Sequence, residues 1–356
     1  MKNKVENISI VVTEMSGFGG TEKMINTVID HYSKDNGKTL NLVSFYSVKG
    51  QKWCNADIEV VDILSDRKKN NYVLALSLFM FFLKSDADKV IVTNQFALPV
   101  ISYARKFNHK KFEIISWVHF DLVEGPMSSE SKISAITNYA DKFISLSDSN
   151  SELLLSKGFS SDNLYTVYNP VTITQSMIPS SSKGTYQFIY VGRLQFSEKS
   201  QKNNKEFFDA LIRIKKLDWF LNIYGDGEDL ESEKLYISQN GLDHKVKFHG
   251  WVNKPFNEIK EADCLVMSST YEGFPLTVVE AMSYGIPVVS SNINGPNEII
   301  NDKNGVLYDK GNNKQLSLIL KNLIRGKISF DHRIIQETCY RFSEESFFEK
   351  FDRIFD

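Results

Sequence analysis

The sequence predicts an α/β protein of two domains, each with a parallel sheet covered by helices. Short apolar runs bounded by turn residues alternate with helix-length segments, as in parallel sheets packed between helices. The same alternation starts again near the middle of the chain. The 356 residues are also enough for two hydrophobic cores of ordinary size.

The first domain is expected over residues 1–170. A helix over 23–32 should follow its first strand. The apolar segment 72–83 is shorter than the roughly 20 residues that span a membrane, so we expect a buried helix, with membrane-surface contact as the alternative. The polar start has no signal-peptide pattern, which predicts a cytoplasmic protein. The predicted strands are 8–12, 40–45, 89–93, 113–118 and 142–147.

The second domain is expected over residues 186–340, after a turn-rich linker at 171–185. The closing segment, 341–356, has aromatic residues spaced for one helical face and Ser343 placed as an N-cap. We therefore expect a terminal helix that docks back on the protein. The predicted strands of this domain are 186–192, 220–224, 246–248, 264–268 and 288–291.

Composition excludes several function classes. Apolar content of 42%, charged content of 24% and a formal charge of −2 are those of a globular protein with no affinity for nucleic acid. The three cysteines are distant from one another and predict neither disulfides nor a metal cluster. Asp86 and Asp88 match an Asp-x-Asp metal pattern, but they precede a strand, so we interpret them as a solvated turn and expect no metal.

A glycine-rich turn that includes Gly19 and Gly20 follows the first strand. Such a turn brings backbone N–H groups close to an anion or sugar, although it can also serve the chain reversal alone. A dinucleotide fingerprint would need glycine where Glu22 stands. A P-loop ending at 37–39 would need glycine where Tyr32 stands. Both of these nucleotide motifs are therefore excluded.

Cationic and glycine-rich segments follow the strands of the second domain. Arg193 ends its first strand, and Lys199 and Lys202 follow in a polar loop. Their charges suit a diphosphate, and ligands of open α/β sheets bind at the carboxyl ends of the strands. Tyr224 precedes a Gly-Asp-Gly turn, and Trp251 with Val252 follows the next strand. Contact with a nucleotide base and simple packing both remain open for Trp251.

The segment 268–290 is the most informative part of the sequence. Pro275 suits the first turn of a helix and Gly285 its end, which predicts a helix over 275–284. Its free N–H groups would face an anion, with Glu272 just before the helix and Glu280 in its second turn. Carboxylates accept hydrogen bonds from the paired hydroxyls of a hexose or ribose. The residues expected to line the site here also include Gly273, Phe274, Leu276 and Thr277.

Taken together, these motifs resemble glycosyltransferase family 4, with the GT-B architecture of two facing Rossmann-like domains. The resemblance rests on Gly19 and Gly20, His119 at a strand end, Arg193, the 224–227 turn and the E-x7-E pattern of 272–280. Residues 16–20 and 117–121 are also similar to the lipopolysaccharide-core galactosyltransferase branch. A lone histidine is otherwise commonly structural, and for His119 both interpretations stay open.

The resemblance implies a role for each residue. Arg193 and Lys202, with Lys199 as the second choice, would meet the donor diphosphate, Glu280 the ribose and Glu272 the transferred sugar. His119 would contact the sugar or assist near the acceptor. The catalytic set is then His119, Arg193, Lys202 and Glu272, and the donor-binding set is Gly19, Gly20, Tyr224, Trp251, Val252, Gly273, Phe274, Pro275, Leu276, Thr277 and Glu280.

The expected function is that of a retaining, metal-independent hexosyltransferase without a cofactor. It would move galactose, glucose or an N-acetylhexosamine from a UDP-sugar to a glycan, glycolipid or glycoprotein acceptor in cell-surface polysaccharide synthesis. A lipid-linked acceptor would add peripheral contact with the inner face of the membrane. The alternatives are a non-catalytic subunit of the same architecture that binds an acceptor or a partner enzyme, and a nucleotide-sugar epimerase.

Overall fold

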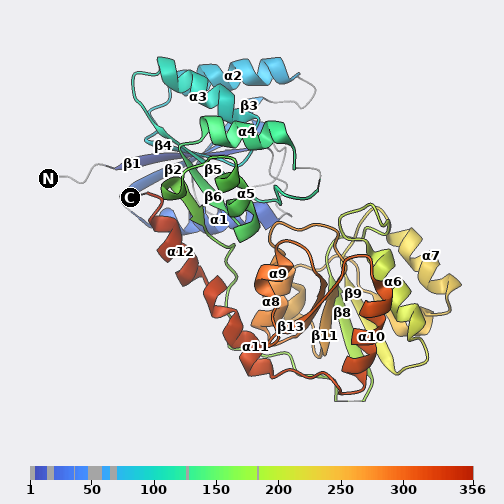
Figure 1. The fold of residues 1–356 in the computed structure, drawn as a ribbon. Helices are drawn as coiled ribbons and strands as arrows, with labels where there is room; N and C mark the ends of the chain where they lie inside the picture. Colours follow the sequence, from blue (N-terminus) through green and yellow to red (C-terminus); the bar gives the residue numbers. More distant parts are fainter. Residues whose placement is uncertain are drawn as a thin grey trace. The chain divides into compact units, whose positions relative to one another are not determined.

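The structure is a computed structural model that describes residues 5–13, 20–35, 37–46, 58–64, 70–125, 128–182 and 184–355. The chain forms two compact units (Figure 1). Unit 1 comprises Met1–Val167 together with Lys350–Asp356, and unit 2 comprises Tyr168–Glu349. Each contains one sheet of parallel strands, so the predicted α/β class with two such domains is confirmed.

The sheet of unit 1 has the strand order β3-β2-β1-β4-β5-β6-β7. The order reverses between β1 and β4, which is where open α/β sheets bind ligands. All five predicted strands are present, and β3 and β7 at the two edges were not predicted. The strands are β1 (Glu6–Val12), β2 (Lys38–Tyr46), β3 (Glu59–Leu64), β4 (Lys89–Val92), β5 (Glu113–Trp117), β6 (Lys142–Ser145) and β7 (Leu164–Thr166).

The helices of unit 1 include one that corrects the sequence interpretation. The helix expected over 72–83 forms as α2, but Leu74, Leu78 and Phe82 are its only fully buried residues, and its opposite face is exposed. The prediction of a buried helix is therefore wrong for half of its surface, because α2 packs along one face only. The helices are α1 (Gly20–Tyr32), α2 (Asn71–Leu83), α3 (Ala97–Phe107), α4 (Glu130–Tyr139) and α5 (Asp148–Ser156), with a 3-10 turn η1 (Ser161–Asn163).

The sheet of unit 2 has the strand order β10-β9-β8-β11-β12-β13. Its five predicted strands are present, and β13 is an additional edge strand whose Gly305 approaches the Val288 carbonyl too closely for any side chain. The strands are β8 (Tyr186–Val191), β9 (Trp219–Tyr224), β10 (Val246–Phe248), β11 (Cys264–Met267), β12 (Val288–Ser291) and β13 (Gly305–Tyr308).

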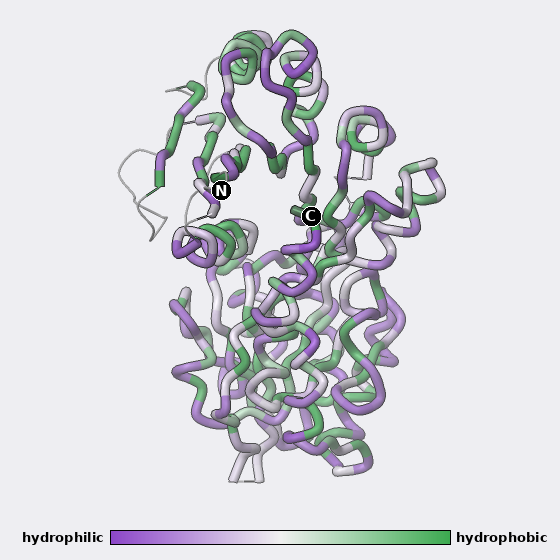
Figure 2. The backbone as a smooth tube through the Cα atoms, turned by 90° about the vertical axis from the view of Figure 1, so that its left-hand side faces the viewer, coloured by the Kyte–Doolittle hydropathy of each residue, from purple (hydrophilic) through white to green (hydrophobic). Residues whose placement is uncertain are grey.

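The helix predicted over 275–284 is shorter than expected. It forms as α8 over Leu276–Ser283, and Pro275 is its extended N-cap residue and not part of its first turn. The helices of this unit are α6 (Asn204–Arg213), α7 (Leu230–Gln239), α8, α9 (Pro296–Ile299), α10 (Asn313–Ile324) and α11 (His332–Thr338). The 3-10 turns are η2 (Asp243–Lys245), η3 (Pro255–Asn257) and η4 (Tyr340–Phe342). Figure 2 shows hydrophilic and hydrophobic segments alternating along the backbone.

The predicted terminal helix is present as α12 (Glu344–Asp352), which begins in unit 2 and ends in unit 1. Within unit 1, the Phe351 ring lies 6.3 Å from that of Tyr32 and 5.2 Å from that of Trp117. Tyr32 also donates a hydrogen bond to the Asp352 carboxylate. The end of the chain is therefore part of the first core. No helix of the described ranges is long and apolar enough to cross a bilayer.

Candidate functional site

The loops that follow β8, β9 and β10 are joined at one edge of the second sheet. The Gly192 amide donates to the Tyr224 carbonyl at 3.1 Å, and the Gly225 amide donates to the Gly250 carbonyl at 2.8 Å. A Cβ atom added to Gly225 would lie 1.8 Å from the Gly192 oxygen, so only glycine fits there. The glycines of the 224–227 turn thus let two strand-end loops pass close together, which brings the Arg193 and Tyr224 segments side by side.

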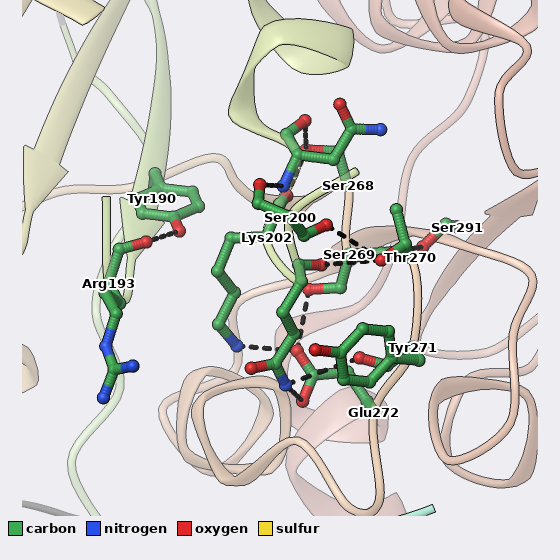
Figure 3. A network of polar contacts seen from close by, with 12 residues as sticks. Tyr190, Arg193, Ser200, Lys202, Ser268, Ser269, Thr270, Tyr271, Glu272 and Ser291 are labelled. Carbon is green, nitrogen blue, oxygen red and sulfur yellow. Dashed lines mark hydrogen bonds and ion pairs between the residues drawn. The ribbon is translucent and has the colours of Figure 1, made fainter. Parts of the chain in front are cut away.

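A buried ion pair lies beside these loops. Lys202 Nζ is 2.6 Å from Glu272 Oε1, and the same oxygen accepts a hydrogen bond from Ser269 Oγ at 2.7 Å. Gln201 Nε2 donates to the other oxygen, Glu272 Oε2, at 3.2 Å. Figure 3 shows the Lys202 and Glu272 side chains directed toward one another. The Glu272 carboxylate is therefore buried, charge-compensated and fixed in orientation.

The backbone of the loop that carries Lys202 is held by the strand end opposite. Ser268 Oγ donates to the carbonyls of Lys202 and Asn203 at 3.2 and 3.0 Å, and the Thr270 amide donates to the Gln201 carbonyl at 2.7 Å. Asn203 has a φ of +45°, a left-handed conformation that asparagine tolerates better than most residues. The structure thus places Lys202 against Glu272, whereas Lys199 is exposed farther back in the loop.

Arg193 supplies a second cation at the same sheet edge. Its carbonyl accepts a hydrogen bond from the buried Tyr190 hydroxyl at 2.6 Å. Its side chain is exposed and extends in the same direction as that of Lys202 (Figure 3). Among the described residues, no hydrogen-bond partner holds the guanidinium. Two cations at the strand ends, Lys202 paired with Glu272 and Arg193 exposed, make this edge suited to an anionic ligand.

Two buried acids accept hydrogen bonds from the asparagines that directly follow Lys202. Asn204 Nδ2 donates to Glu233 Oε1 at 2.8 Å, and Asn203 Nδ2 donates to Glu206 Oε2 at 2.7 Å. Burial raises the pKa of the Glu233 carboxyl to about 8 and also raises the pKa of Glu206. Sequence reasoning missed both acids, since an isolated glutamate in a helical segment has the pattern of a solvated residue.

The start of α8 contains several other residues that were predicted to bind the nucleotide-sugar donor. Pro275 caps the helix, and Leu276 and Thr277 form its first turn, where backbone N–H groups lack helical acceptors. Gly273 precedes them, and its carbonyl would lie 2.9 Å from a Cβ atom on Gly295. Gly295 therefore has to be glycine for the two loops to approach so closely.

Two further predicted residues belong to this helix segment. The Phe274 ring is buried and stacks on Tyr168 at 5.6 Å, with Phe342 at 5.4 Å on another side. Phe274 therefore anchors the turn before α8 with its side chain, and only its backbone can serve a ligand. Glu280 lies within α8 and is half-buried.

Aromatic residues follow β9 and β10. The Tyr224 ring stacks face to face on His249 at 4.3 Å, and His249 Nε2 lies 2.9 Å from Asn222 Oδ1. Burial, followed by the charge of nearby Lys247, lowers the pKa of His249. Trp251 is 58% exposed, so it is no core residue, and the neighbouring Val252 is half-buried. Two stacked rings, Tyr224 and His249, and the exposed Trp251 thus follow neighbouring strands.

The remaining predicted residues belong to unit 1. His119 follows β5, with its ring 4.4 Å from that of Trp117. Both of its ring nitrogens are buried and have no hydrogen-bond partner within the described ranges. Burial lowers the pKa of His119 to about 3, so the imidazole is neutral at ordinary pH. Gly20 is the first residue of α1, and Gly19 lies outside the described residues.

The described part of the chain contains no group of three or more histidine, cysteine, aspartate or glutamate side chains arranged to hold a metal ion. Asp88 of the Asp-x-Asp pattern pairs with Lys110 at 3.0 Å, and Asp86 accepts from Asn7 at 3.3 Å. Cys264 and Cys339 are buried free thiols, and Cys54 lies outside the described residues.

Residues 174–339 match the family described as glycosyl transferases group 1. Over 97% of its length the chain is 33% identical to the lipopolysaccharide 1,6-galactosyltransferase of Salmonella typhimurium, of which it covers 97%. The chain belongs to the group 1 glycosyltransferases. The predicted enzyme class, a glycosyltransferase, is therefore confirmed.

Two solved structures share its fold. The apo form of the lipopolysaccharide outer core galactosyltransferase WaaB aligns with a TM-score of 0.86 at 30% identity, over 98% of this chain and 99% of that one. HepE of Anabaena, solved in complex with UDP-glucose, aligns with a TM-score of 0.77 at 18% identity, over 98% and 99%. The predicted GT-B fold is confirmed by these two likenesses.

Proposed function

We propose that this chain is a retaining galactosyltransferase of glycosyltransferase family 4 that uses UDP-galactose and a lipopolysaccharide-core acceptor. The choice of sugar and acceptor is supported by the full-length similarity to a lipopolysaccharide 1,6-galactosyltransferase. The observation that carries the proposal is the buried Glu272 carboxylate, held by Lys202, Ser269 and Gln201 beside the exposed Arg193. A carboxylate that can accept hydrogen bonds from sugar hydroxyls would thus lie beside two cations that can bind the diphosphate.

The cations and the start of α8 would stabilise the leaving group. Charge develops on the UDP β-phosphate as its bond to the galactose C1 breaks, and Arg193, Lys202 and the N–H groups before Thr277 would balance that charge. The acceptor oxygen forms its bond to C1 on the same face, and its proton passes to the departing phosphate oxygen. UDP and the glycoside are the products, and neither a metal nor a cofactor is required.

The carboxylates would orient the donor. Glu272 accepts hydrogen bonds from galactose hydroxyls, and Glu280 accepts them from the ribose. Tyr224, Trp251 and Val252 at the ends of β9 and β10 would support the base.

His119 would act as a neutral hydrogen-bonding group. Its two ring nitrogens are buried without partners among the described residues, a state that a ligand hydroxyl relieves. A neutral imidazole donates from one nitrogen and accepts at the other, so it can bind a sugar hydroxyl without adding charge. Its role is therefore orientation of the sugar or acceptor.

The donor is tested by thermal shift with UDP-galactose, UDP-glucose, UDP-N-acetylglucosamine and GDP-mannose, followed by UDP release. We expect UDP-galactose to raise the melting temperature most and to be consumed faster when a core lipopolysaccharide lacking its galactose branch is added. Nuclear magnetic resonance of the product should show an α-linkage, and EDTA should leave the rate unchanged.

Each of the other outcomes contradicts a distinct part of the proposal. Stabilisation by none of the nucleotide sugars would favour a non-catalytic subunit. Conversion of UDP-galactose to UDP-glucose without transfer would favour an epimerase. A β-linked product would overturn retention, and loss of activity in EDTA would overturn metal independence.

A further inference from the structure

Three neighbouring helices of unit 1 expose large apolar and aromatic side chains. On α2, Tyr72 is 85% exposed and Leu76 is 63% exposed, and Met80 follows on the same helix. The other exposed residues are Tyr103 and Phe107 of α3 and Tyr139 of α4. We call these six residues the α2–α4 patch. Protein surfaces that face only water rarely gather such residues in one place, so the patch indicates a binding surface.

The patch is hollowed by a groove of about 680 Å³. Leu76 and Phe79 of α2 line one side, Val100 and Tyr103 of α3 line the other, and Tyr139 of α4 closes an end. The only charged residue that lines this groove is Lys106. An apolar groove with a single cation suits a ligand that joins hydrocarbon to negative charge.

The charged residues of α2 and α3, which form the two sides of the groove, are all basic. The segment of α2 contains no charged residue, and that of α3 contains no acid. Exposed lysines lie at the ends of these helices: Lys84 follows α2, Lys106 is in the last turn of α3, and Lys111 lies just beyond it. The acids near these helices have partners of their own: Asp86 accepts a hydrogen bond from Asn7, Asp88 pairs with Lys110, and Glu130 of α4 pairs with Lys157.

We propose that the α2–α4 patch docks the protein on a membrane surface that contains anionic phospholipids. The apolar side chains would enter the boundary between headgroups and acyl chains, and the lysines would meet the phosphates. Tyrosines with an apolar ring and a polar tip suit this boundary, where one end is dry and the other wet. The inference does not depend on the sugar or the reaction, because it rests on the surface of unit 1 alone.

The test is co-sedimentation of the full chain with vesicles. Equal mixtures of phosphatidylglycerol and phosphatidylcholine serve as the anionic surface, and pure phosphatidylcholine serves as the neutral one. We expect binding to the anionic vesicles that weakens as salt rises. Leu76→Ser should weaken it by about tenfold through lost apolar burial, and Lys106→Ser by about fivefold through the lost charge.

A matched control is available in unit 2. Leu318 of α10 is 56% exposed, close to the value for Leu76, so Leu318→Ser should leave vesicle binding unchanged. The melting temperature and UDP-sugar turnover in solution should be the same for all three variants. These readouts separate a lost membrane contact from a lost fold or a lost donor site.

Three results would overturn the proposal. One is recovery of the wild-type chain entirely in the supernatant with anionic vesicles. Leu318→Ser could weaken binding as much as Leu76→Ser does. Light scattering could instead reveal a dimer that Leu76→Ser dissociates while vesicles bind neither form, and the patch would then be a contact between two copies of the chain.

Discussion

Lys202 Nζ lies 2.6 Å from Glu272 Oε1, although the two residues are 70 positions apart in the sequence. The pair joins the loop before α6 to the turn before α8, and both side chains are largely buried. Removing one partner of a buried pair leaves the other charge uncompensated. The two residues therefore act as one unit, and the effects of their substitutions should not add.

Replacement of the two loop lysines should separate their roles. Lys202→Ala is expected to lower kcat/KM for transfer by about 100- to 1000-fold, since it removes a preorganised cation from the leaving group. Lys199→Ala should change it by less than about twofold, because that side chain is exposed and outside the network. Steady-state kinetics on both variants decides the point, and a larger loss in Lys199→Ala would reverse the assignment.

Neutralising Glu272 should affect the sugar more than the nucleotide. In Glu272→Gln the side chain keeps its size but loses its charge and its pairing with Lys202. We expect kcat to fall by roughly 100-fold, while UDP still raises the melting temperature about as much as in the wild type. Isothermal titration with UDP and with UDP-galactose provides the measurement. Weakened binding of UDP alone would place Glu272 at the diphosphate.

The double variant Lys202→Ala/Glu272→Gln tests the coupling directly. Because neither single variant can keep the ion pair, we expect the double variant to lose little more activity than the worse single one. Multiplicative losses in kcat/KM would show that the two residues act independently.

A side chain at Gly225 should disturb the donor site. In Gly225→Ala, the new Cβ atom would lie 1.8 Å from the Gly192 oxygen, so one strand-end loop has to move. We expect loss of UDP binding and a destabilisation of roughly 2–4 kcal/mol. Gly241→Ala is the control, because nothing lies within 4 Å of its Cβ position and its φ of +69° alone should cost about 1 kcal/mol. If the two variants lost equal stability in thermal denaturation and equal affinity in UDP titration, this explanation would be contradicted.

Glu233 should make stability depend on pH. Its folded pKa of about 8 lies above the ordinary value of 4.5, so between these pH values the folded protein holds a proton that the unfolded chain releases. The stabilisation from this proton is complete below about pH 4.5 and is lost as the pH rises to about 8, at a rate of up to about 1.4 kcal/mol per pH unit. Glu233→Gln removes this loss, so the variant should gain stability relative to the wild type from pH 5.5 to 8.5. Urea denaturation of both proteins at pH 5.5 and 8.5 measures the free energy of unfolding. An equal change with pH in the wild type and the variant would refute the prediction.

The sequence predicted the parts of the fold that have their own local signal. The buried strand β11 is a continuous apolar run and β4 is apolar after its first residue, and the helix α8 is marked by Pro275 and Gly285, so all three could be located in advance. The edge strands β3, β7 and β13 were missed, because an edge needs less apolar sequence than a central strand.

The candidate site likewise contains residues that the sequence indicated and residues that it did not. Arg193 and Glu272 stand next to glycines that follow strands, and these local signals pointed to them. Lys202 has no such signal and was chosen over Lys199 from the family resemblance alone. Gln201 and Ser269 carry no such signal, and they became visible only when the fold brought them to one carboxylate. The exposed face of α2 was also invisible to periodicity, because the segment is apolar on all sides and burial depends on the neighbours.

Unit 1 is not a continuous stretch of polypeptide, since Lys350–Asp356 completes it from the far end of the sequence. A fragment cut after Val167 would lack Phe351, which covers the rings of Tyr32 and Trp117. Exchanging domains between enzymes of this kind therefore needs two junctions and not one. A chimaera that takes its first half from a relative should take the last seven residues from the same parent.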